Sequence, residues 1–316
     1  MNVYLVTGGA GFIGSHLVSE LVKRKQVVRV LDNFSTGKKE NLEQVLDRIQ
    51  LVTGDIRSFD LAKEVTKGVD YVLHQAALPS VERSVKDPLT TNQVNLDGTL
   101  NLLEAAKLNS VKSFVFASSS SVYGNTPKLP KKEKMPPDPL SPYALSKLAG
   151  ERYCRLFFEL YGLNTVCLRY FNVFGPRQDP QSHYAAVIPK FILAMVREQP
   201  PTIFGDGRQS RDFTFIDNVV RANLLACENR LAAGEIFNIA CGKRFSLNQL
   251  YKILTRTLGN SRRPVYTKPR PGDVRHSLAD ISKSRKILKY KVEVDFQTGL
   301  RRTIDWFLAS RSFWEN

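Results

Sequence analysis

Tyr143 and Lys147 are the two side chains of this 316-residue chain whose types and spacing most clearly suggest chemistry. Pro142 suits the first turn of a helix, and residues four apart on a helix lie on one face. An ammonium group near a phenol favours the phenolate, so we expect Lys147 to lower the pKa of Tyr143 from its usual value of about 10. A phenol tuned in this way can act as a general base or acid near neutral pH. Because this spacing also occurs by chance, it needs support from other parts of the chain.

A run of four serines, Ser118–Ser121, offers hydroxyl groups to the same site. It follows the segment Ser113–Ala117, which we predict to be a strand. Ligands of doubly wound sheets bind at the carboxyl ends of the strands, so these hydroxyls are expected to face a cofactor. An ordinary polar loop is the alternative for any single serine.

Three glycines near the start of the chain, Gly8, Gly11 and Gly14, lie between a predicted strand and a predicted helix. Glycines at this spacing permit a tight turn and let backbone amides approach a pyrophosphate, and the helix N-terminus adds its partial positive charge. Asp32 ends the next predicted strand, where a carboxylate accepts hydrogen bonds from both ribose hydroxyls of the adenosine and repels a 2′-phosphate. The pattern predicts a bound dinucleotide and favours NAD over NADP.

Other residues near this pattern bear on the same prediction. Lys38 and Lys39 lie a few residues after Asp32, and their positive charges weaken the argument against the 2′-phosphate of NADP. Asp55 and Ile56 follow the third predicted strand, where Asp55 either meets the adenine or caps a helix.

The elements that would hold these residues alternate between strands and helices through the first half of the chain. Near-continuous apolar strands separated by helices indicate a parallel, doubly wound sheet, so we predict an α/β Rossmann domain with a smaller, interleaved α/β substrate domain. We place the NAD-binding domain at 1–177 plus 211–241 and the substrate domain at 178–210 plus 242–316. The charged segment Lys128–Met135 is expected to be an exposed loop. The predicted strands are Val3–Thr7, Val27–Leu31, Ile49–Thr53, Val69–His74, Ser113–Ala117 and Thr165–Tyr170, and the predicted helices are Phe12–Lys25, Leu89–Leu108 and Pro142–Tyr161.

The composition favours a small anionic ligand over a nucleic acid. The formal net charge is +16, but lysines and arginines are spread along the whole chain without a basic run interleaved with aromatics. No apolar run reaches the roughly 20 residues of a membrane span, and the chain begins inside its first strand, so we expect a cytoplasmic protein with no membrane or nucleic-acid partner. The four cysteines and four histidines are scattered, so no metal site is predicted and the cysteines are expected to be buried apolar residues.

Four motifs together resemble one known family. They are Gly8–Gly14, the serine run ending in Val122-Tyr123-Gly124, Ser141–Lys147 and Leu168–Pro176. With these motifs the chain resembles the extended short-chain dehydrogenases, and specifically the UDP-hexose 4-epimerases, over nearly its whole length. The resemblance implies that Ser119, four residues before Tyr123, is the active-site serine, and that Ser120 and Ser121 support it or touch the sugar.

The resemblance also implies a mechanism without net oxidation. Tyr143 takes the proton of the sugar 4-hydroxyl, a hydride moves from C4 to NAD, the 4-keto sugar turns, and the hydride returns to the other face. Ser119 stabilises the charge that develops on O4. Eliminating relatives carry Asp-Glu where this chain has Ser120 and Ser121, and serines cannot do that acid–base work near neutral pH. Epimerisation is therefore expected.

By this resemblance a larger set of residues surrounds the two ligands. On the substrate side, Asn172 would meet the phosphates, Arg211 would clamp the pyrophosphate and Phe204 would stack on the uracil. The residues implied to bind NAD are Gly8, Gly11, Phe12, Ile13, Gly14, Asp32, Asn33, Gly37, Asp55, Ile56, Gln75, Ala76, Ala77, Asn95, Ser118, Tyr143, Lys147, Tyr170 and Val173. Those implied to bind the UDP-sugar are Ser80, Arg83, Ser119, Ser120, Ser121, Tyr143, Asn172, Ala186, Val187, Phe204, Arg211, Arg270, Asp273 and Ser277.

Ser277 is the residue that bears on the choice of sugar. In the resembled family this position faces the sugar 2-position, where a tyrosine restricts the enzyme to UDP-glucose and UDP-galactose and a small residue admits an N-acetyl group. The segments Tyr184–Pro189 and Pro79–Ser84 also look like the N-acetyl subgroup, and Pro79 stands where glucose-specific members usually have lysine. We predict a UDP-GlcNAc/UDP-GalNAc 4-epimerase that also admits UDP-Glc/UDP-Gal. The alternatives are a UDP-glucose or UDP-uronic acid 4-epimerase, another NAD-dependent nucleotide-sugar enzyme, or a non-catalytic NAD-binding module, which typically loses the Tyr/Lys pair.

Two long predicted helices, Leu89–Leu108 and Pro142–Tyr161, form the dimer surface in the resembled family. We expect a homodimer in which these helices build a four-helix bundle across a two-fold axis, unless the monomer itself covers them.

Overall fold

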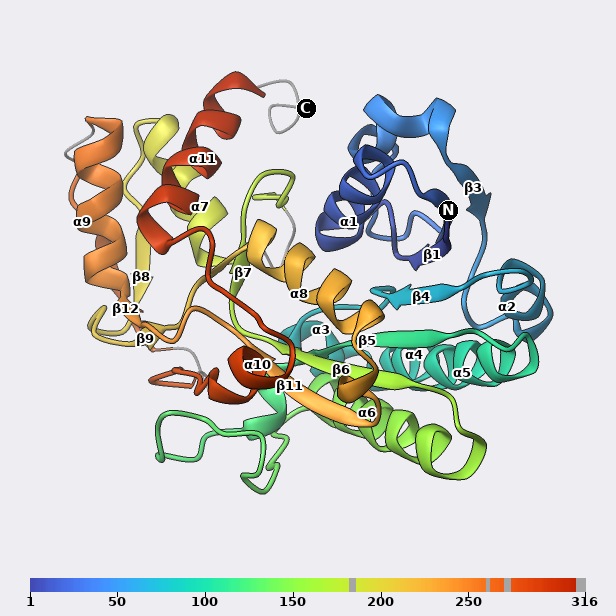
Figure 1. The fold of residues 1–316 in the computed structure, drawn as a ribbon. Helices are drawn as coiled ribbons and strands as arrows, with labels where there is room; N and C mark the ends of the chain where they lie inside the picture. The colour runs from blue at the N-terminus through green and yellow to red at the C-terminus, as the bar shows by residue number, and fades with distance from the viewer. Residues whose placement is uncertain (182–185, 260–261, 270–273, 311–316) are drawn as a thin grey trace.

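The computed structural model describes residues 1–181, 186–259, 262–269 and 274–310, and its centre is a seven-stranded sheet (Figure 1). The strand order is β11-β6-β5-β4-β1-β2-β3, and every neighbouring pair is parallel. The predicted doubly wound α/β fold is therefore confirmed. The strands are β1 (Val3–Thr7), β2 (Val27–Asp32), β3 (Gln50–Thr53), β4 (Tyr71–His74), β5 (Ser113–Ser119), β6 (Thr165–Tyr170) and β11 (Glu235–Ile239).

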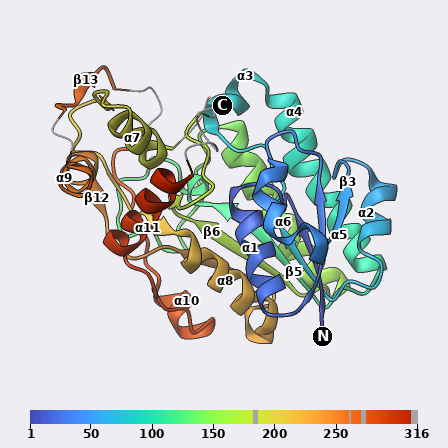
Figure 2. The ribbon, with the colours of Figure 1, turned by 90° about the horizontal axis from the view of Figure 1, so that it is seen from above.

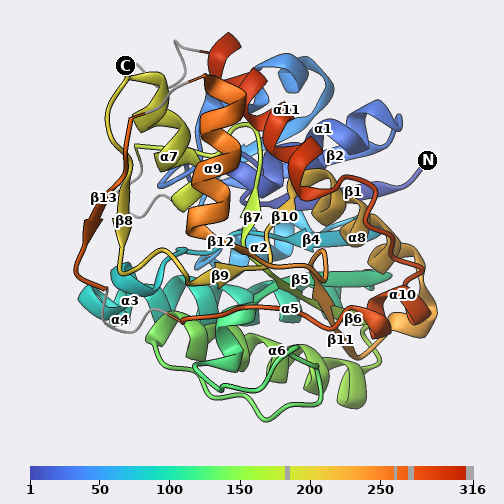
Figure 3. The ribbon, with the colours of Figure 1, turned by 90° about the vertical axis from the view of Figure 1, so that its left-hand side faces the viewer.

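Helices cover both faces of this sheet, which is why the central strands are apolar throughout. Figure 3 shows α5 and α6 on one side of the strands and α1 and α8 on the other. The buried residues divide accordingly into two clusters, with Phe114 and Phe116 facing α6 and Val115 and Ala117 on the opposite side. The helices beside the sheet are α1 (Phe12–Lys23), α2 (Phe59–Val65), α3 (Val81–Lys86), α4 (Pro88–Asn92), α5 (Gly98–Leu108), α6 (Pro142–Tyr161) and α8 (Ile216–Glu228).

The remaining elements form a smaller part beside one end of the sheet, with short strand pairs of their own (Figure 2). β12 pairs with β9, β13 with β8, and β10 with β7. The domain boundaries given above remain a prediction. These elements are β7 (Val173–Phe174), α7 (Val187–Val196), β8 (Thr202–Phe204), β9 (Ser210–Arg211), β10 (Thr214–Phe215), β12 (Phe245–Ser246), α9 (Leu247–Leu258), β13 (Val265–Thr267), α10 (Ser282–Ile287) and α11 (Phe296–Ala309).

The predicted helix Leu89–Leu108 begins one residue earlier and is not uniform. A wider π-helical turn, Gln93–Asp97, separates α4 from α5. Such turns often mark functional positions in helices. Here the turn contains Asn95, whose side chain hydrogen-bonds both the amide and the carbonyl of Leu78.

The prediction that Lys128–Met135 is an exposed loop is wrong at its centre. Lys131 is buried, pairs with Ala279 as a short bridge, and its ammonium group donates to the carbonyl and hydroxyl of Thr126. The polar sequence gave no sign of this pairing, because its partner lies far along the chain.

No helix among the described residues combines the length and the apolar character that crossing a membrane requires. Cys154, Cys167 and Cys227 are buried as predicted, and Cys241 is half-buried.

Candidate active site

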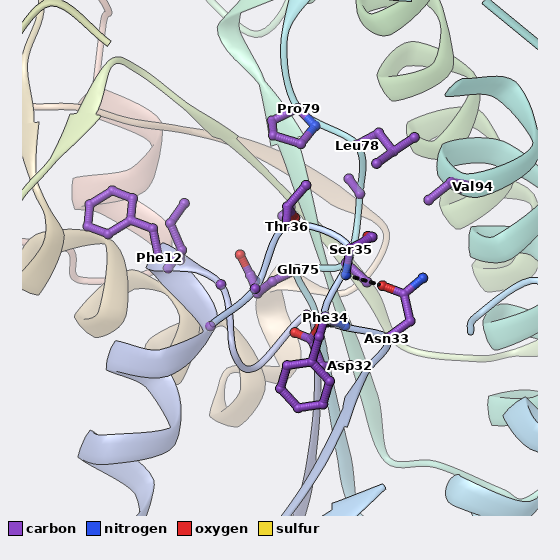
Figure 4. Close-up of a pocket in the computed structure, with 18 of the residues that line it drawn as sticks. Phe12, Asp32, Asn33, Phe34, Ser35, Thr36, Gln75, Leu78, Pro79 and Val94 are labelled. Carbon is purple, nitrogen blue, oxygen red and sulfur yellow. Dashed lines mark hydrogen bonds between the residues drawn. The ribbon is translucent and has the colours of Figure 1, made fainter. Parts of the chain in front are cut away.

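A cavity of about 760 Å³ lies along the carboxyl ends of the central strands (Figure 4). Figure 4 shows the segment from Asp32 to Thr36 within it, with Phe12, Leu78 and Pro79 on its wall. This is where the geometry of a doubly wound sheet places a ligand, since the helices leave that edge of the strands uncovered.

The glycine turn between β1 and α1 forms one wall of the cavity and has no room for a side chain at Gly8 or Gly14. A Cβ atom at Gly14 would lie 2.1 Å from the carbonyl oxygen of Gly8. Gly8 has a φ of +66°, and a Cβ there would lie 2.7 Å from the amide nitrogen of Ala76. Gly11 caps α1 without any side-chain hydrogen bond to the first turn, so the helix N-terminus stays available to an anion.

Asp32 ends β2 on the cavity wall, as the sequence predicts. Its two carboxylate oxygens accept hydrogen bonds from the amides of Ala10 (2.9 Å) and Phe34 (2.8 Å). Burial raises the pKa of Asp32, and these two amides oppose that rise. The amides also fix the carboxylate beside Gly37, where a Cβ would approach it to 2.9 Å.

Asp55 lies on the same wall, but its carboxylate is already engaged. Arg57 donates to both oxygens (3.0 and 2.8 Å), and Asn33 donates to one of them at 2.8 Å. The hydrogen bonds from Arg57 lower the pKa of Asp55 to about 2. The carboxylate therefore stays ionised and joins the ends of β2 and β3.

Tyr143 reaches the cavity from the first turn of α6, which Ser141 caps by accepting a hydrogen bond from the amide of Ala144. The Ser119 side chain at the end of β5 lies near the phenol of Tyr143. Burial raises the pKa of Tyr143, and the nearby Ser119 hydroxyl lowers it in part. The fold thus brings the predicted tyrosine and serine together, although they are distant in sequence.

Lys147 lies one turn further along α6 and is buried, and its ammonium group donates to the carbonyl of Ala117 at 2.8 Å. Burial lowers the pKa of Lys147 to about 8. The nitrogen is 6.0 Å from the centre of the Tyr143 ring. The expectation that Lys147 lowers the pKa of Tyr143 is therefore wrong for this structure, because burial governs the phenol and the ammonium group is directed at the strand.

Most of the residues predicted to bind NAD share this wall. Asn95 and Val173 are not on it, and Asn95 acts on the wall only through Leu78. Ser118 lines the cavity, yet its hydroxyl donates to Glu151 on α6. Those on the wall are Gly8, Gly11, Phe12, Ile13, Gly14, Asp32, Asn33, Gly37, Asp55, Ile56, Gln75, Ala76, Ala77, Ser118, Tyr143, Lys147 and Tyr170.

The residues predicted to bind the sugar nucleotide are more scattered. Ser80, Arg83, Tyr143 and Ala186 line the cavity. The Ser121 hydroxyl oxygen is buried and has no hydrogen-bond partner within the described ranges, as expected of a group that awaits a ligand. Arg270 and Asp273 lie outside the described residues. Those described but not on the wall are Ser119, Ser120, Ser121, Asn172, Val187, Phe204, Arg211 and Ser277.

Backbone pairing brings two of these scattered residues together. Ser210 in β9 bridges to His276, and the amide of Ser277 donates to the carbonyl of Ser210 at 2.9 Å. Arg211 is the next residue in the chain, and its side chain donates to the carbonyls of Ser210 and Arg275.

Asn172 lies close to the same segment. Its backbone has a φ of +36°, and its side-chain nitrogen donates to the carbonyl of Asp212, the residue that follows β9.

The sequence did not single out Arg177 or Asp179, which also line the cavity. Arg177 donates to the carbonyl of Ser15 (3.1 Å) and the hydroxyl of Ser19 (3.0 Å) on α1. Asp179 pairs with Lys38 at 3.0 Å, which links the loop after β7 to the loop after β2. The only sequence signal for this loop was its position directly after the Phe-Gly-Pro motif.

The fold and the site together define a class of enzyme, the extended short-chain dehydrogenases that bind a dinucleotide at the carboxyl edge of a parallel sheet. The close backbone approach at Gly8 and Gly14 and the carboxylate of Asp32 on the cavity wall fit NAD. A family model described as "NAD dependent epimerase/dehydratase family" matches residues 4–240. The chain belongs to this family, and it is an NAD-dependent UDP-sugar 4-epimerase.

Three relatives illustrate the similarity. A structure described as UDP-N-acetylglucosamine 4-epimerase from Methanobrevibacter ruminantium M1, in complex with UDP-N-acetylmuramic acid, is 45% identical with a TM-score of 0.93 and covers 98% of both chains. A UDP-glucose 4-epimerase of Thermotoga maritima, solved with UDP-glucose, is 40% identical with a TM-score of 0.94 and covers 98% of this chain and 99% of its own. The UDP-glucose 4-epimerase of Mycolicibacterium smegmatis is 38% identical over 96% of this chain and 97% of its own.

Proposed function

We propose that this enzyme interconverts UDP-GlcNAc and UDP-GalNAc, with UDP-Glc and UDP-Gal as a second substrate pair. The observation that carries the proposal is Ser277, a small, half-buried residue whose backbone is fixed to β9 next to Arg211. A serine leaves room where a tyrosine would fill the space beside the sugar 2-position. The Methanobrevibacter relative, described as acting on UDP-GlcNAc, supports the same choice.

We infer the following roles for the residues of the site. Tyr143 takes the proton of the sugar 4-hydroxyl and returns it at the end of the cycle. Ser119, whose hydroxyl lies near Tyr143, donates to the sugar O4 as charge develops there. NAD supplies, when bound, the acceptor and then the donor of the hydride at C4. Lys147, which lines the cavity one turn of α6 beyond Tyr143, binds the cofactor beside the phenol.

Arg211 and Asn172 are the proposed phosphate ligands. Both side chains donate to backbone carbonyls of one short segment, Asn172 to that of Asp212 and Arg211 to that of Ser210. A guanidinium group binds phosphate through two hydrogen bonds, which suits Arg211 to the pyrophosphate.

Ser277→Tyr tests the choice of sugar. We expect activity on UDP-GlcNAc to fall at least about 100-fold, because a clash of this size costs about 3 kcal/mol, while activity on UDP-Glc changes little. Ser277→Ala, which keeps the position small, serves as the matched control and should retain both activities. An equal loss on both sugars in the tyrosine variant would rule out this role for Ser277.

We also propose a homodimer through α4, α5 and α6. One face of α6 exposes Leu145, Leu156 and Leu160, which are 57%, 44% and 66% accessible, and Leu89 on the adjacent α4 is 76% accessible. Exposed leucines gathered on adjacent helices in this way are typical of an interface with a second copy.

A further inference from the structure

Three successive residues at the end of β5 each meet a different residue on one face of α6. The Ala117 carbonyl accepts from Lys147, and the Ser118 hydroxyl donates to Glu151. The Ser119 hydroxyl lies near the phenol of Tyr143 and lowers its pKa. Tyr143, Lys147 and Glu151 are spaced four residues apart, so they follow one another along the same face of the helix. Two of these three contacts involve residues of the proposed mechanism, and the third involves Glu151, which has no role assigned so far.

Glu151 is part of a buried ion pair with Arg169 of β6. Arg169 donates through Nε to one carboxylate oxygen (2.8 Å) and through Nη2 to the other (2.7 Å). Both side chains are almost fully buried, at 3% and 1% accessibility. The pair holds the pKa of Arg169 above its usual value. Buried ion pairs contribute little net stability, because removing both charges from water offsets their attraction. Their geometry is therefore the property to explain.

The same ion pair contacts two residues, Ser118 and Tyr123, that lie on either side of the other three serines. At one end, Glu151 accepts the hydrogen bond from Ser118, which is also the register partner of Arg169 in the sheet. At the other end, the Arg169 guanidinium lies 4.6 Å from the centre of the Tyr123 ring, and the Tyr123 hydroxyl donates to Asn238 at 2.7 Å. The residues between these two points include the three serines that we propose contact the substrate, Ser119, Ser120 and Ser121.

Neighbouring side chains on a strand point to opposite faces of the sheet because the backbone alternates. The hydrogen bond from Ser118 to Glu151 holds the backbone at the end of β5, and with it the face on which Ser119 lies. The Ser119 hydroxyl lies near Tyr143 and accepts the amide of Ser121 at 3.1 Å. The orientation of the active-site serine thus depends both on its own turn and on how firmly Ser118 holds the end of the strand.

We propose that Glu151 and Arg169 are positioning residues for the epimerase reaction, which act through Ser118 to aim Ser119 at the reacting oxygen. Neither touches the substrate or the cofactor. Their effect is expected on the turnover number rather than on substrate binding.

The direct test removes the link and leaves the ion pair intact. In Ser118→Ala the two hydrogen bonds from Arg169 to Glu151 remain. We expect kcat to fall about tenfold, as for one misdirected hydrogen bond in the transition state, while KM for the UDP-sugar and the NAD content of the purified protein stay unchanged. Ser113→Ala, the same substitution at the opposite end of β5, is the matched control and should behave as the wild type. A Ser118→Ala enzyme with wild-type kcat would overturn the proposal, and so would a loss that comes entirely from lower NAD content.

A second measurement asks whether the effect passes through Ser119. In a Ser119→Ala background the further change Ser118→Ala should reduce kcat by less than about twofold, since there is no hydroxyl left to aim. If Ser118→Ala lowers kcat by the same factor with and without Ser119→Ala, the two effects are independent and the proposal is contradicted.

The ion pair itself is tested with Glu151→Met/Arg169→Met, which removes both charges together and avoids a single unpaired buried charge. We expect this double variant to keep the thermal stability of the wild type and to show the same loss of kcat as Ser118→Ala. Retained kcat in the folded double variant would overturn the role of the pair. If the double variant does not fold, the Ser118→Ala and Ser119→Ala results decide the question.

Discussion

Replacing Lys147 with methionine should make the protein more stable and nearly inactive. Lys147 is buried, and burial lowers its pKa from 10.5 to about 8. That difference corresponds to about 3 kcal/mol by which the folded state disfavours the ammonium form relative to the unfolded chain. Methionine removes this cost, and it also removes the hydrogen bond to Ala117, which is worth about 1 kcal/mol. At pH 7 the variant should therefore be more stable by about 2 kcal/mol.

The size of this stability difference depends on pH. Below pH 8 the amine is charged in both states and the folded wild type carries the whole cost. Between about 8 and 10.5 the folded state releases its proton first, so the free energy of unfolding of the wild type rises with pH. The gap between variant and wild type should close to nearly zero by pH 10.

The assay is urea unfolding of both proteins without nucleotide, at several pH values from 7 to 10. Lys67→Met, at an exposed lysine, is the control and should differ from the wild type by the same small amount at every pH. Turnover of Lys147→Met should drop by at least about 100-fold, as expected when a positioned polar group is lost from the wall of the active site. A stability difference that does not change between pH 7 and pH 10 would refute the reasoning about Lys147.

Three further predictions concern the cofactor and the dimer. Gly14→Ala should weaken NAD binding and lower the free energy of unfolding by about 2 kcal/mol, because the new Cβ would lie 2.1 Å from the Gly8 carbonyl oxygen. A calorimetric titration that shows wild-type affinity for NAD would contradict this. Asp32→Asn should raise the affinity for NADP relative to NAD by about tenfold, since the charge that repels the 2′-phosphate is lost. An unchanged ratio of NADP to NAD affinity in competitive binding would argue against this role of Asp32. The double variant Leu156→Glu/Leu160→Glu should be monomeric in light scattering, while the wild type should be dimeric. A monomeric wild type would exclude the proposed interface.

The parts of the site that could be predicted from sequence are those built by local rules. The turn at Gly8–Gly14 and the carboxylate at Asp32 follow directly from a strand–turn–helix pattern, and the structure places them on the cavity wall. Tyr143 also follows from such a pattern, since Pro142 starts the helix that carries it. Local geometry was sufficient in each case because the neighbours in sequence are also the neighbours in space.

The features that sequence could not provide depend on contacts between distant segments. Arg177 lines the cavity because it packs across α1, and Lys131 is buried because it bridges to Ala279. The pKa of Tyr143 was predicted in the wrong direction because burial, which depends on the whole fold, outweighs a nearby charge. Glu151 gave no sequence signal, since its importance comes from Arg169 on another strand.

The most direct test of the account is a product analysis with the purified enzyme and UDP-GlcNAc, UDP-Glc and UDP-GlcA side by side. NMR should show the 4-epimer of UDP-GlcNAc at the highest rate, a slower conversion of UDP-Glc, and no net accumulation of NADH with either. Tyr143→Phe should abolish both conversions and keep the bound NAD. Faster conversion of UDP-GlcA, or a product other than a 4-epimer, would contradict the proposed function.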